Sequence, residues 1–324
     1  MINSKNKINA SISLDLDNQW AYMQVHGDKG WEEYPSYLDK FLPHALDMLD
    51  KFGLKITFFI VGKDAADKKN ADVMKEITLR GHEVGNHSYN HEAKFNIYTQ
   101  DEILTELEKT EEAVEKVTGK LPNGFRGPGF TRSKELYKIL KAKKYLYDAS
   151  TLPTWIGPFA RWYYFRHSTL TEEEMKAREG LFGSFKEGFE RIKPFLWNLS
   201  DGEQLLEIPV STIPLLKLPF HFSYLHYLAG VSVSAMNIYL QTAITMCKLT
   251  NTEPSFLLHP LDLIGGDLVP ELDFFPGMEL STSYKTELYE IVMNKLKSNF
   301  NLLNMSDHAE IILAKKNLPK KNIY

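Results

Sequence analysis

The sequence has almost no cysteine: Cys247 is the only one among 324 residues. A lone thiol excludes an intramolecular disulfide and any metal site built from several cysteines. A chain of this length can bury a large core without such crosslinks, so a bound metal is expected to be catalytic rather than structural. The ten histidines are then the candidate metal ligands and acid–base groups.

An excess of charge of one sign and long apolar runs are also lacking. The 38 lysines and arginines nearly balance the 42 aspartates and glutamates, which argues against binding to nucleic acid. No apolar run reaches the ~18 residues of a membrane-spanning helix. The N-terminal lysines are not followed by the apolar core of a secretion signal. We therefore expect a globular, cytoplasmic protein.

Short apolar runs alternate with segments of helical periodicity through the first half of the chain. This alternation predicts a parallel α/β sheet or barrel. The expected strands are 8–16, 55–61, 82–86, the region of Phe125, 145–147, 205–210, 255–258 and 301–305. The expected helices are 35–52, 65–79, 99–117, 133–144, 235–247 and 284–298. Residues 18–31 are expected to form a long loop, and 156–204 an insertion.

Two pairs of polar residues follow the first and third expected strands. Asp15 and Asp17 are two positions apart, so both carboxylates lie on one face at the carboxyl end of a strand, where barrels place catalytic groups. His87 and His91 are spaced so that one helical turn would point both imidazoles at one ion. The alternatives are capping acids and surface histidines.

Three further polar side chains follow other expected strands. Arg126 lies in a Gly/Pro-rich loop, Asp148 follows a tyrosine, and His259 ends an apolar run. Each is a weak signal alone, and a lone arginine at a strand end is usually a salt-bridge residue. Together, the strand ends indicate one site at one edge of the sheet.

On these residues the sequence resembles the polysaccharide deacetylase family, the NodB-homology enzymes similar to carbohydrate esterase family 4. It resembles the subset with a spaced Asp-x-Asp first motif. The matching segments are Asp15-Leu16-Asp17, His87-Ser88-Tyr89-Asn90-His91, Arg126-Gly127-Pro128, Asp148 with Trp155, and Leu257-Leu258-His259. The last two matches are looser than the others.

The resemblance implies a single distorted (β/α)7 TIM-like barrel over residues 1–312. It would be interrupted by the insertion at about 156–204 and an apolar segment at about 211–234. A basic, frayed tail would follow at 313–324. The resemblance also implies a divalent metal ion, Zn²⁺ first among the candidates, bound by Asp17, His87 and His91.

The other motif residues would move protons. Asp15 would be the general base, and Arg126 would orient it. His259 would be the general acid, with Asp148 holding its imidazole. A backbone N–H near Gly129 would meet the developing oxyanion. Residues expected to contact substrate are Trp20, Trp31, Pro128, Gly129 and Trp155, although Trp20 and Trp31 could equally anchor their own loop.

The implied activity is hydrolysis of an N-acetyl or N-formyl group on an amino sugar of a cell-envelope glycan. One alternative is hydrolysis of a C–N bond in a small cyclic amide or imide. Another is a non-catalytic glycan-binding protein, which the chemically competent motif residues argue against.

The segment from residue 208 to residue 247 has a single charged side chain, Lys217. Its aromatic part, 215–228, suits contact with the inner membrane surface and a lipid-linked sugar. An oligomer interface and a buried core segment are the alternatives.

Overall fold

One sheet of ten strands organises the part of the chain that the computed structural model describes, namely residues 7–92, 97–159, 162, 171, 175, 185–199 and 202–323. The strands are β1 (Ile8–Leu16), β2 (Thr57–Ile60), β3 (Glu83–Asn86), β4 (Gly124–Phe125), β5 (Tyr147–Asp148), β6 (Phe195–Asn198), β7 (Gln204–Glu207), β8 (Ser255–Leu258), β9 (Phe300–Leu303) and β10 (Lys320–Asn322). Their order is β10-β6-β7-β5-β4-β3-β2-β1-β8, with β9 also beside β1.

The sheet is mostly parallel, which confirms the expected α/β class. From β7 through β5, β4, β3, β2 and β1 to β8, every neighbouring pair is parallel. Only β6 runs antiparallel to its neighbour β7, and β10 pairs with β6 in the parallel sense. The carboxyl ends of the parallel strands therefore meet at one edge.

The expected barrel is an open ring between β7 and β8. No ladder joins these two strands among the residues described, and they lie toward opposite ends of the parallel strand order. The chain beyond β7 nevertheless bridges the gap, because the Ser211 backbone N–H donates to the Ser255 carbonyl at 3.0 Å. The Ser211 hydroxyl donates to the same oxygen. The two ends of the sheet are thus held together by side-chain and backbone hydrogen bonds rather than by a full ladder.

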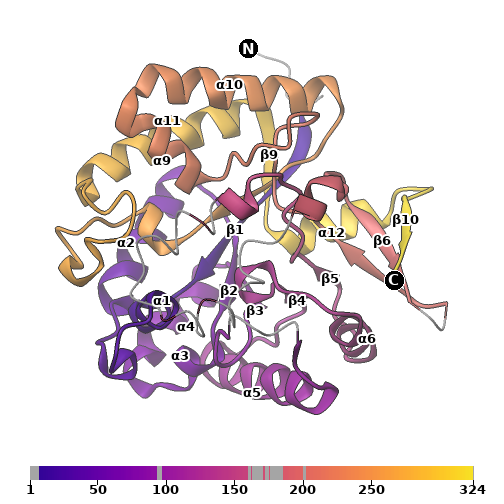
Figure 1. Ribbon diagram of the computed structural model, residues 1–324, viewed down its shortest axis with the longest axis horizontal. Coiled ribbons are helices and arrows are strands. Elements are labelled where there is room, and N and C mark those ends of the chain that lie inside the picture. Colours follow the sequence, from indigo (N-terminus) through magenta and orange to yellow (C-terminus); the bar gives the residue numbers. More distant parts are fainter. Residues whose placement is uncertain are drawn as a thin grey trace.

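Helices lie around the strands (Figure 1). They are α1 (Gln19–His26), α2 (Leu38–Phe52), α3 (Gly62–Ala66), α4 (Ala71–Leu79), α5 (Gln100–Thr118), α6 (Lys134–Ala142), α9 (Phe222–Val231), α10 (Val233–Leu249), α11 (Thr282–Asn299) and α12 (Met305–Leu313). Thr99 and Glu102 form the predicted capping box at the start of α5. No helix in the described residues is long and apolar enough to cross a membrane.

Three segments differ from expectation. Residues 18–31 contain α1 rather than only a loop, because the Asn18 side chain accepts a hydrogen bond from the first helical N–H. About half of the expected insertion, 156–204, lies outside the described residues, but β6 within it joins the sheet. The tail expected to fray instead forms β10, which pairs with β6.

The core is built around β1, which pairs with three strands. Residues 13–16 of β1 align with β2, 11–14 with β8 and 8–11 with β9. Its apolar residues Ile12, Leu14 and Leu16 are fully buried in the cluster that includes Phe41 and Leu46 of α2. Burying each such side chain contributes about 1.5–3 kcal/mol. A rigid β1 fixes the position of the two acids at its carboxyl end.

Candidate metal centre and active site

The acid pair lies where the sequence predicts it, at the carboxyl end of β1. Asp15 is in register with Phe59 of β2, and Asp17 follows the last residue of β1. Both side chains are buried, and the Tyr37 hydroxyl donates a hydrogen bond to the Asp17 carbonyl. The period of two in β1 turns both carboxylates toward the same histidine, because the His87 Nε2 atom lies 3.4 Å from Asp17 and 4.0 Å from Asp15.

The two histidines of the second motif do not form a helical turn, which corrects the sequence interpretation. They lie in an irregular turn after β3, with Ser88 and His91 in the left-handed region at φ 61° and 50°. The buried Glu106 of α5 holds this turn by accepting two of its backbone N–H groups, at 2.8 and 2.9 Å. Sequence reasoning missed Glu106, which looks like an ordinary helix residue.

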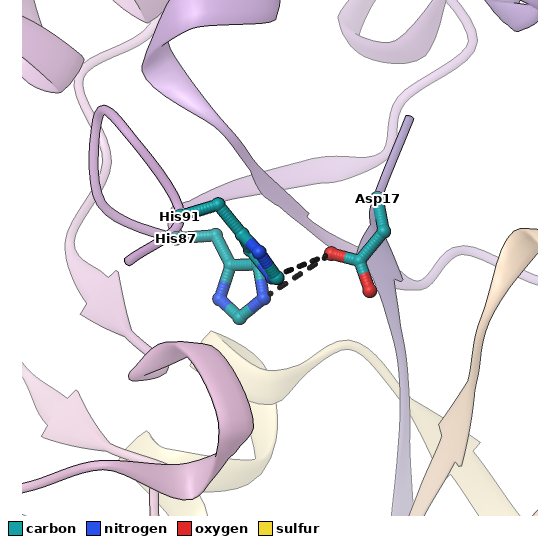
Figure 2. A group of neighbouring side chains, drawn as sticks. All are labelled: Asp17, His87 and His91. Carbon is teal, nitrogen blue, oxygen red and sulfur yellow. Dashed lines mark ion pairs between the residues drawn. The ribbon is translucent and has the colours of Figure 1, made fainter. Parts of the chain in front are cut away.

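The turn still brings both imidazoles onto one carboxylate oxygen (Figure 2). The Asp17 Oδ1 atom lies 3.1 Å from the His91 Nε2 and 3.4 Å from the His87 Nε2. The His87 Nδ1 lies 2.7 Å from the Arg126 carbonyl, so this nitrogen carries the proton and leaves Nε2 with a free lone pair.

These residues fit a divalent metal ion. The three ligand atoms of Asp17, His87 and His91 lie within 4.8 Å of one another. Two ligands of a tetrahedral zinc ion with bonds of about 2.1 Å are separated by about 3.4 Å, close to the separations seen here. The buried Asp17 Oδ1 accepts no hydrogen bond from the described residues, so a cation is the partner it lacks.

The charges of Asp17 and the two histidines also bear on metal binding. Burial acts to raise the pKa of Asp17, but His91 and His87 outweigh burial and hold the pKa well below its ordinary value. Burial acts to lower the pKa of His91, but Asp17 outweighs it and raises the pKa. Asp17 is therefore an anion, and a bound cation would take the place of the proton that Asp17 favours on His91.

Arg126 joins the site as a fully buried cation. Its Nη1 donates to the Asp15 carboxylate at 2.7 Å and to the Ser13 hydroxyl at 2.9 Å. Its Nε donates to the Ala149 carbonyl at 3.0 Å, and the guanidinium lies over the Phe59 ring at 4.5 Å. These contacts fix the orientation of Asp15, as the sequence predicts.

The prediction that Asp148 holds the imidazole of His259 is wrong. The structure pairs His259 with Asp262, whose Oδ2 lies 3.8 Å from the His259 Nδ1 and accepts the His259 backbone N–H at 2.7 Å. Burial acts to lower the pKa of His259, but Asp262 outweighs burial and raises the pKa to about 9. The imidazole is therefore a cation at neutral pH. The sequence feature that could have indicated this pair is the i, i+3 spacing of His259 and Asp262 in a turn that contains a proline.

Asp148 contacts Ser150 and Glu207. Its carboxylate accepts a 2.6 Å hydrogen bond from the Ser150 hydroxyl, which accepts the Gly127 backbone N–H at 2.8 Å. Asp148 is aligned with Glu207 of β7, and burial raises the pKa of both carboxyl groups. The pair therefore retains a proton and supports the loop after Arg126. Sequence reasoning missed Glu207, although it ends an apolar strand just as Asp148 does.

The expected substrate contacts divide into two groups. Trp20 is buried, donates to the Asp64 carboxylate at 2.8 Å and packs on Trp31 with Lys63 over both rings, so it anchors its own segment. Pro128 is buried, and Gly129 is partly exposed at φ 58°. Trp155 is partly exposed and packs edge-on against Phe189.

Residues 27–147 match the family model of polysaccharide deacetylases. Over this segment the chain is similar to that family. The segment contains His87, His91 and Arg126, while Asp15 and Asp17 precede it and His259 follows it.

Curated relatives match over parts of the chain. The peptidoglycan-N-acetylglucosamine deacetylase of Bacillus cereus is 37% identical over 91 residues, covering 28% of this chain and 31% of the relative. The peptidoglycan-N-acetylmuramic acid deacetylase of Bacillus subtilis is 35% identical over 92 residues, covering 28% and 34%. The peptidoglycan deacetylase of Helicobacter pylori is 29% identical over 160 residues, covering 47% and 53%. The chain thus spans about a third to a half of the length of these relatives.

The fold is shared over a much longer stretch. The crystal structure of a candidate polysaccharide deacetylase from Mycobacterium smegmatis superposes with a TM-score of 0.60 at 18% sequence identity. The superposition covers 99% of this chain and 96% of the other. The strands outside the deacetylase segment, including β1 and β8, therefore belong to the same overall architecture.

Proposed function

We propose that this protein is a metal-dependent hydrolase that removes the N-acetyl group from an amino sugar of a cell-envelope glycan. The observation that supports this most directly is the buried Asp17–His87–His91 cluster with a second carboxylate, Asp15, beside it. The relatives named as peptidoglycan deacetylases indicate the class of substrate.

The donor set suggests Zn²⁺, since two imidazoles and one carboxylate leave room for water and substrate. When bound, the ion would polarise the acyl carbonyl and lower the pKa of water. Asp15, held in place by Arg126, accepts a proton from the attacking water. Protonated His259 gives a proton to the amine nitrogen as the C–N bond breaks. Asp262 keeps His259 charged until that step.

The test is release of acetate from N-acetylglucosamine oligomers and from peptidoglycan by the zinc-loaded protein. Replacing the general base should lower kcat by about 10²–10⁴-fold, so Asp15→Asn should be nearly inactive. Asp72→Asn, an exposed aspartate on α4, is the matched control and should keep full activity. Hydrolysis of cyclic imides without any acetate release would instead favour the alternative reaction.

We also propose that the substrate is lipid-linked and is met at the cytoplasmic surface of the inner membrane. Three apolar side chains, Phe189, Leu215 and Leu216, form what we call the apolar rim; they are 79%, 77% and 51% exposed. Lys217 joins the segment of Leu215 and Leu216 to that of Phe189, because its ammonium donates hydrogen bonds to the Gly188 and Glu190 carbonyls. Leu215 lies at φ 69°, a strained conformation for a leucine.

The rest of the uncharged segment divides between core and site. Phe222, Leu225 and His226 are buried, so this part of the segment offers no surface to a membrane, whereas the turn with Leu215 and Leu216 does. Leu215 and Leu216 of the rim follow β7, whose carboxyl end lies at the edge of the sheet that carries the site. A sugar attached to a membrane lipid could thus reach the site while the rim contacts the acyl region.

Sedimentation with vesicles of phosphatidylethanolamine and phosphatidylglycerol tests the membrane proposal. The wild type should bind, and Leu215→Ser with Leu216→Ser should lose binding but keep activity on soluble oligomers. The control carries Ile238→Ser and Leu249→Ser, which remove equally exposed apolar side chains on α10. Absence of binding by the wild type would contradict the proposal.

A further inference from the structure

Helix α9 turns a polar patch toward His259. Ser223 and His226 lie three residues apart, on one side of the helix, and α9 packs against β8 and the turn Pro260–Asp262. The Ser223 hydroxyl lies 3.4 Å from the His259 Nδ1. His226 is 5% exposed and packs against the Phe222 ring at 4.5 Å. An otherwise apolar helix thus places two polar side chains beside the proton donor.

Asp262 lies between two imidazoles. Its Oδ2 faces His259, and its Oδ1 lies 3.8 Å from the Nδ1 of His226. Burial acts to raise the pKa of Asp262, but His259 outweighs burial and lowers the pKa to about 2. The carboxylate is therefore ionised, only 2% exposed, and oriented by contacts on both of its oxygens.

His226 is neutral and therefore forms no ion pair with Asp262, unlike His259. Burial lowers the pKa of His226 to about 4 despite the nearby carboxylate, so the imidazole is neutral. A neutral imidazole has one N–H, and a carboxylate facing Nδ1 places the proton on that atom. The His226 Nε2 is buried without a hydrogen-bond partner in the described residues, so the contacts that orient the ring are Asp262 at Nδ1 and the Phe222 ring.

We infer that His226 is a positioning residue for the proton donor: its Nδ1, 3.8 Å from the Asp262 Oδ1, keeps the Asp262 carboxylate in place, and this carboxylate in turn orients His259 toward the leaving group. This inference rests on the proposed hydrolase function. The segment 208–247, whose composition indicates no catalytic role, would thus contribute a residue to the reaction. His226 itself does not touch the substrate in this arrangement.

Two substrates separate proton donation from structural damage. An N-acetyl sugar must receive a proton on its leaving amine, whereas 4-nitrophenyl acetate releases a phenolate that needs none. Loss of an oriented general acid should lower kcat on the N-acetyl sugar by about tenfold or more in His226→Phe, with less than about twofold change on the ester. His226→Asn restores a donor near the Nδ1 position and should recover most of the amide activity.

His82→Phe is the matched control, because His82 is also 5% exposed with a pKa lowered to about 4, but it lies at the amino end of β3. Its ratio of amide to ester activity should equal that of the wild type. Equal losses on both substrates in His226→Phe, or no rescue by His226→Asn, would overturn the inference.

A measurement without turnover separates this inference from the proposed function. In ¹⁵N-histidine NMR spectra of the zinc-loaded protein, His226 should be neutral with its proton on Nδ1. A proton on Nε2 would overturn the inference whatever the activity. A wild-type protein that hydrolyses neither substrate would contradict the proposed function, and the tautomer of His226 would still decide the positioning role.

Discussion

The buried pair of Arg126 and Asp15 allows a quantitative prediction. Arg126 is fully buried, and three of its contacts are hydrogen bonds of 2.7–3.0 Å to Asp15, Ser13 and Ala149. The substitution Arg126→Met keeps much of the volume but leaves the Asp15 carboxylate buried and unpaired. Removing one partner of a buried ion pair destabilises a protein by about 3–5 kcal/mol. That is a large part of the ~5–15 kcal/mol by which a typical domain is stable.

A double-mutant cycle separates the charge effect from lost packing. In Arg126→Met with Asp15→Asn no unpaired charge remains, so the double variant should be more stable than the sum of the two single changes predicts. We expect a coupling of about 1–3 kcal/mol. The assay is urea unfolding followed by circular dichroism, with a chelator present so that metal binding does not add stability.

The exposed network around Arg80 supplies the control. Arg80 contacts Asp47, Asp50 and Glu76 at the surface, and Arg80→Met should change the free energy of unfolding by less than about 1 kcal/mol. A similarly small effect of Arg126→Met, or strictly additive effects in the cycle, would refute the view that Arg126 compensates the charge of Asp15.

Three further predictions concern the metal, the acid and the buried carboxyl pair. Alanine substitution of a proposed ligand should abolish bound zinc in metal analysis, whereas Asp15→Asn should keep it; retention by the histidine variants would contradict the assignment of Asp17, His87 and His91. Because Asp262 raises the pKa of His259 to about 9, kcat should fall as pH rises through that value, and the fall should begin at lower pH in Asp262→Asn. Burial and Asp148 raise the pKa of Glu207, so the native state binds the extra proton and loses stability as pH rises above ~4.3. Urea unfolding should show a weaker loss with pH in Glu207→Gln, and identical slopes would refute the shared proton.

Much of this site could be predicted from the sequence because its residues follow strands. The apolar runs of β1 and β2 indicate buried strands, and parallel strands bring their carboxyl ends together. That rule is enough to gather Asp15, Asp17 and Arg126 at one edge. It needs the order of the strands but not the detailed path of the loops.

The parts that were missed depend on loop paths and on long-range pairing. Both Asp148 and Asp262 are acids near a strand end, and only the turn after β8 shows that the second faces His259. The left-handed Ser88 cannot be inferred from residue type, since serine has no preference for that conformation. β6 and β10 are short strands, with β10 at the edge of the sheet and β6 next to it, and β10 lacks a strong apolar pattern, so the sequence does not indicate them.

The pairing of β1 also sets an order of events during synthesis. β1 is synthesised before the other strands described here, but its residues 8–11 pair with 300–303 and its residues 11–14 with 255–258. Contacts so distant in sequence form slowly, because the intervening chain must lose its freedom first. The strand that presents Asp15 and Asp17 is therefore among the last parts to be completed. A nascent chain that already contains both histidines and Arg126 still lacks a finished β1, so metal binding is expected to follow the synthesis of residues 255–303 rather than guide it.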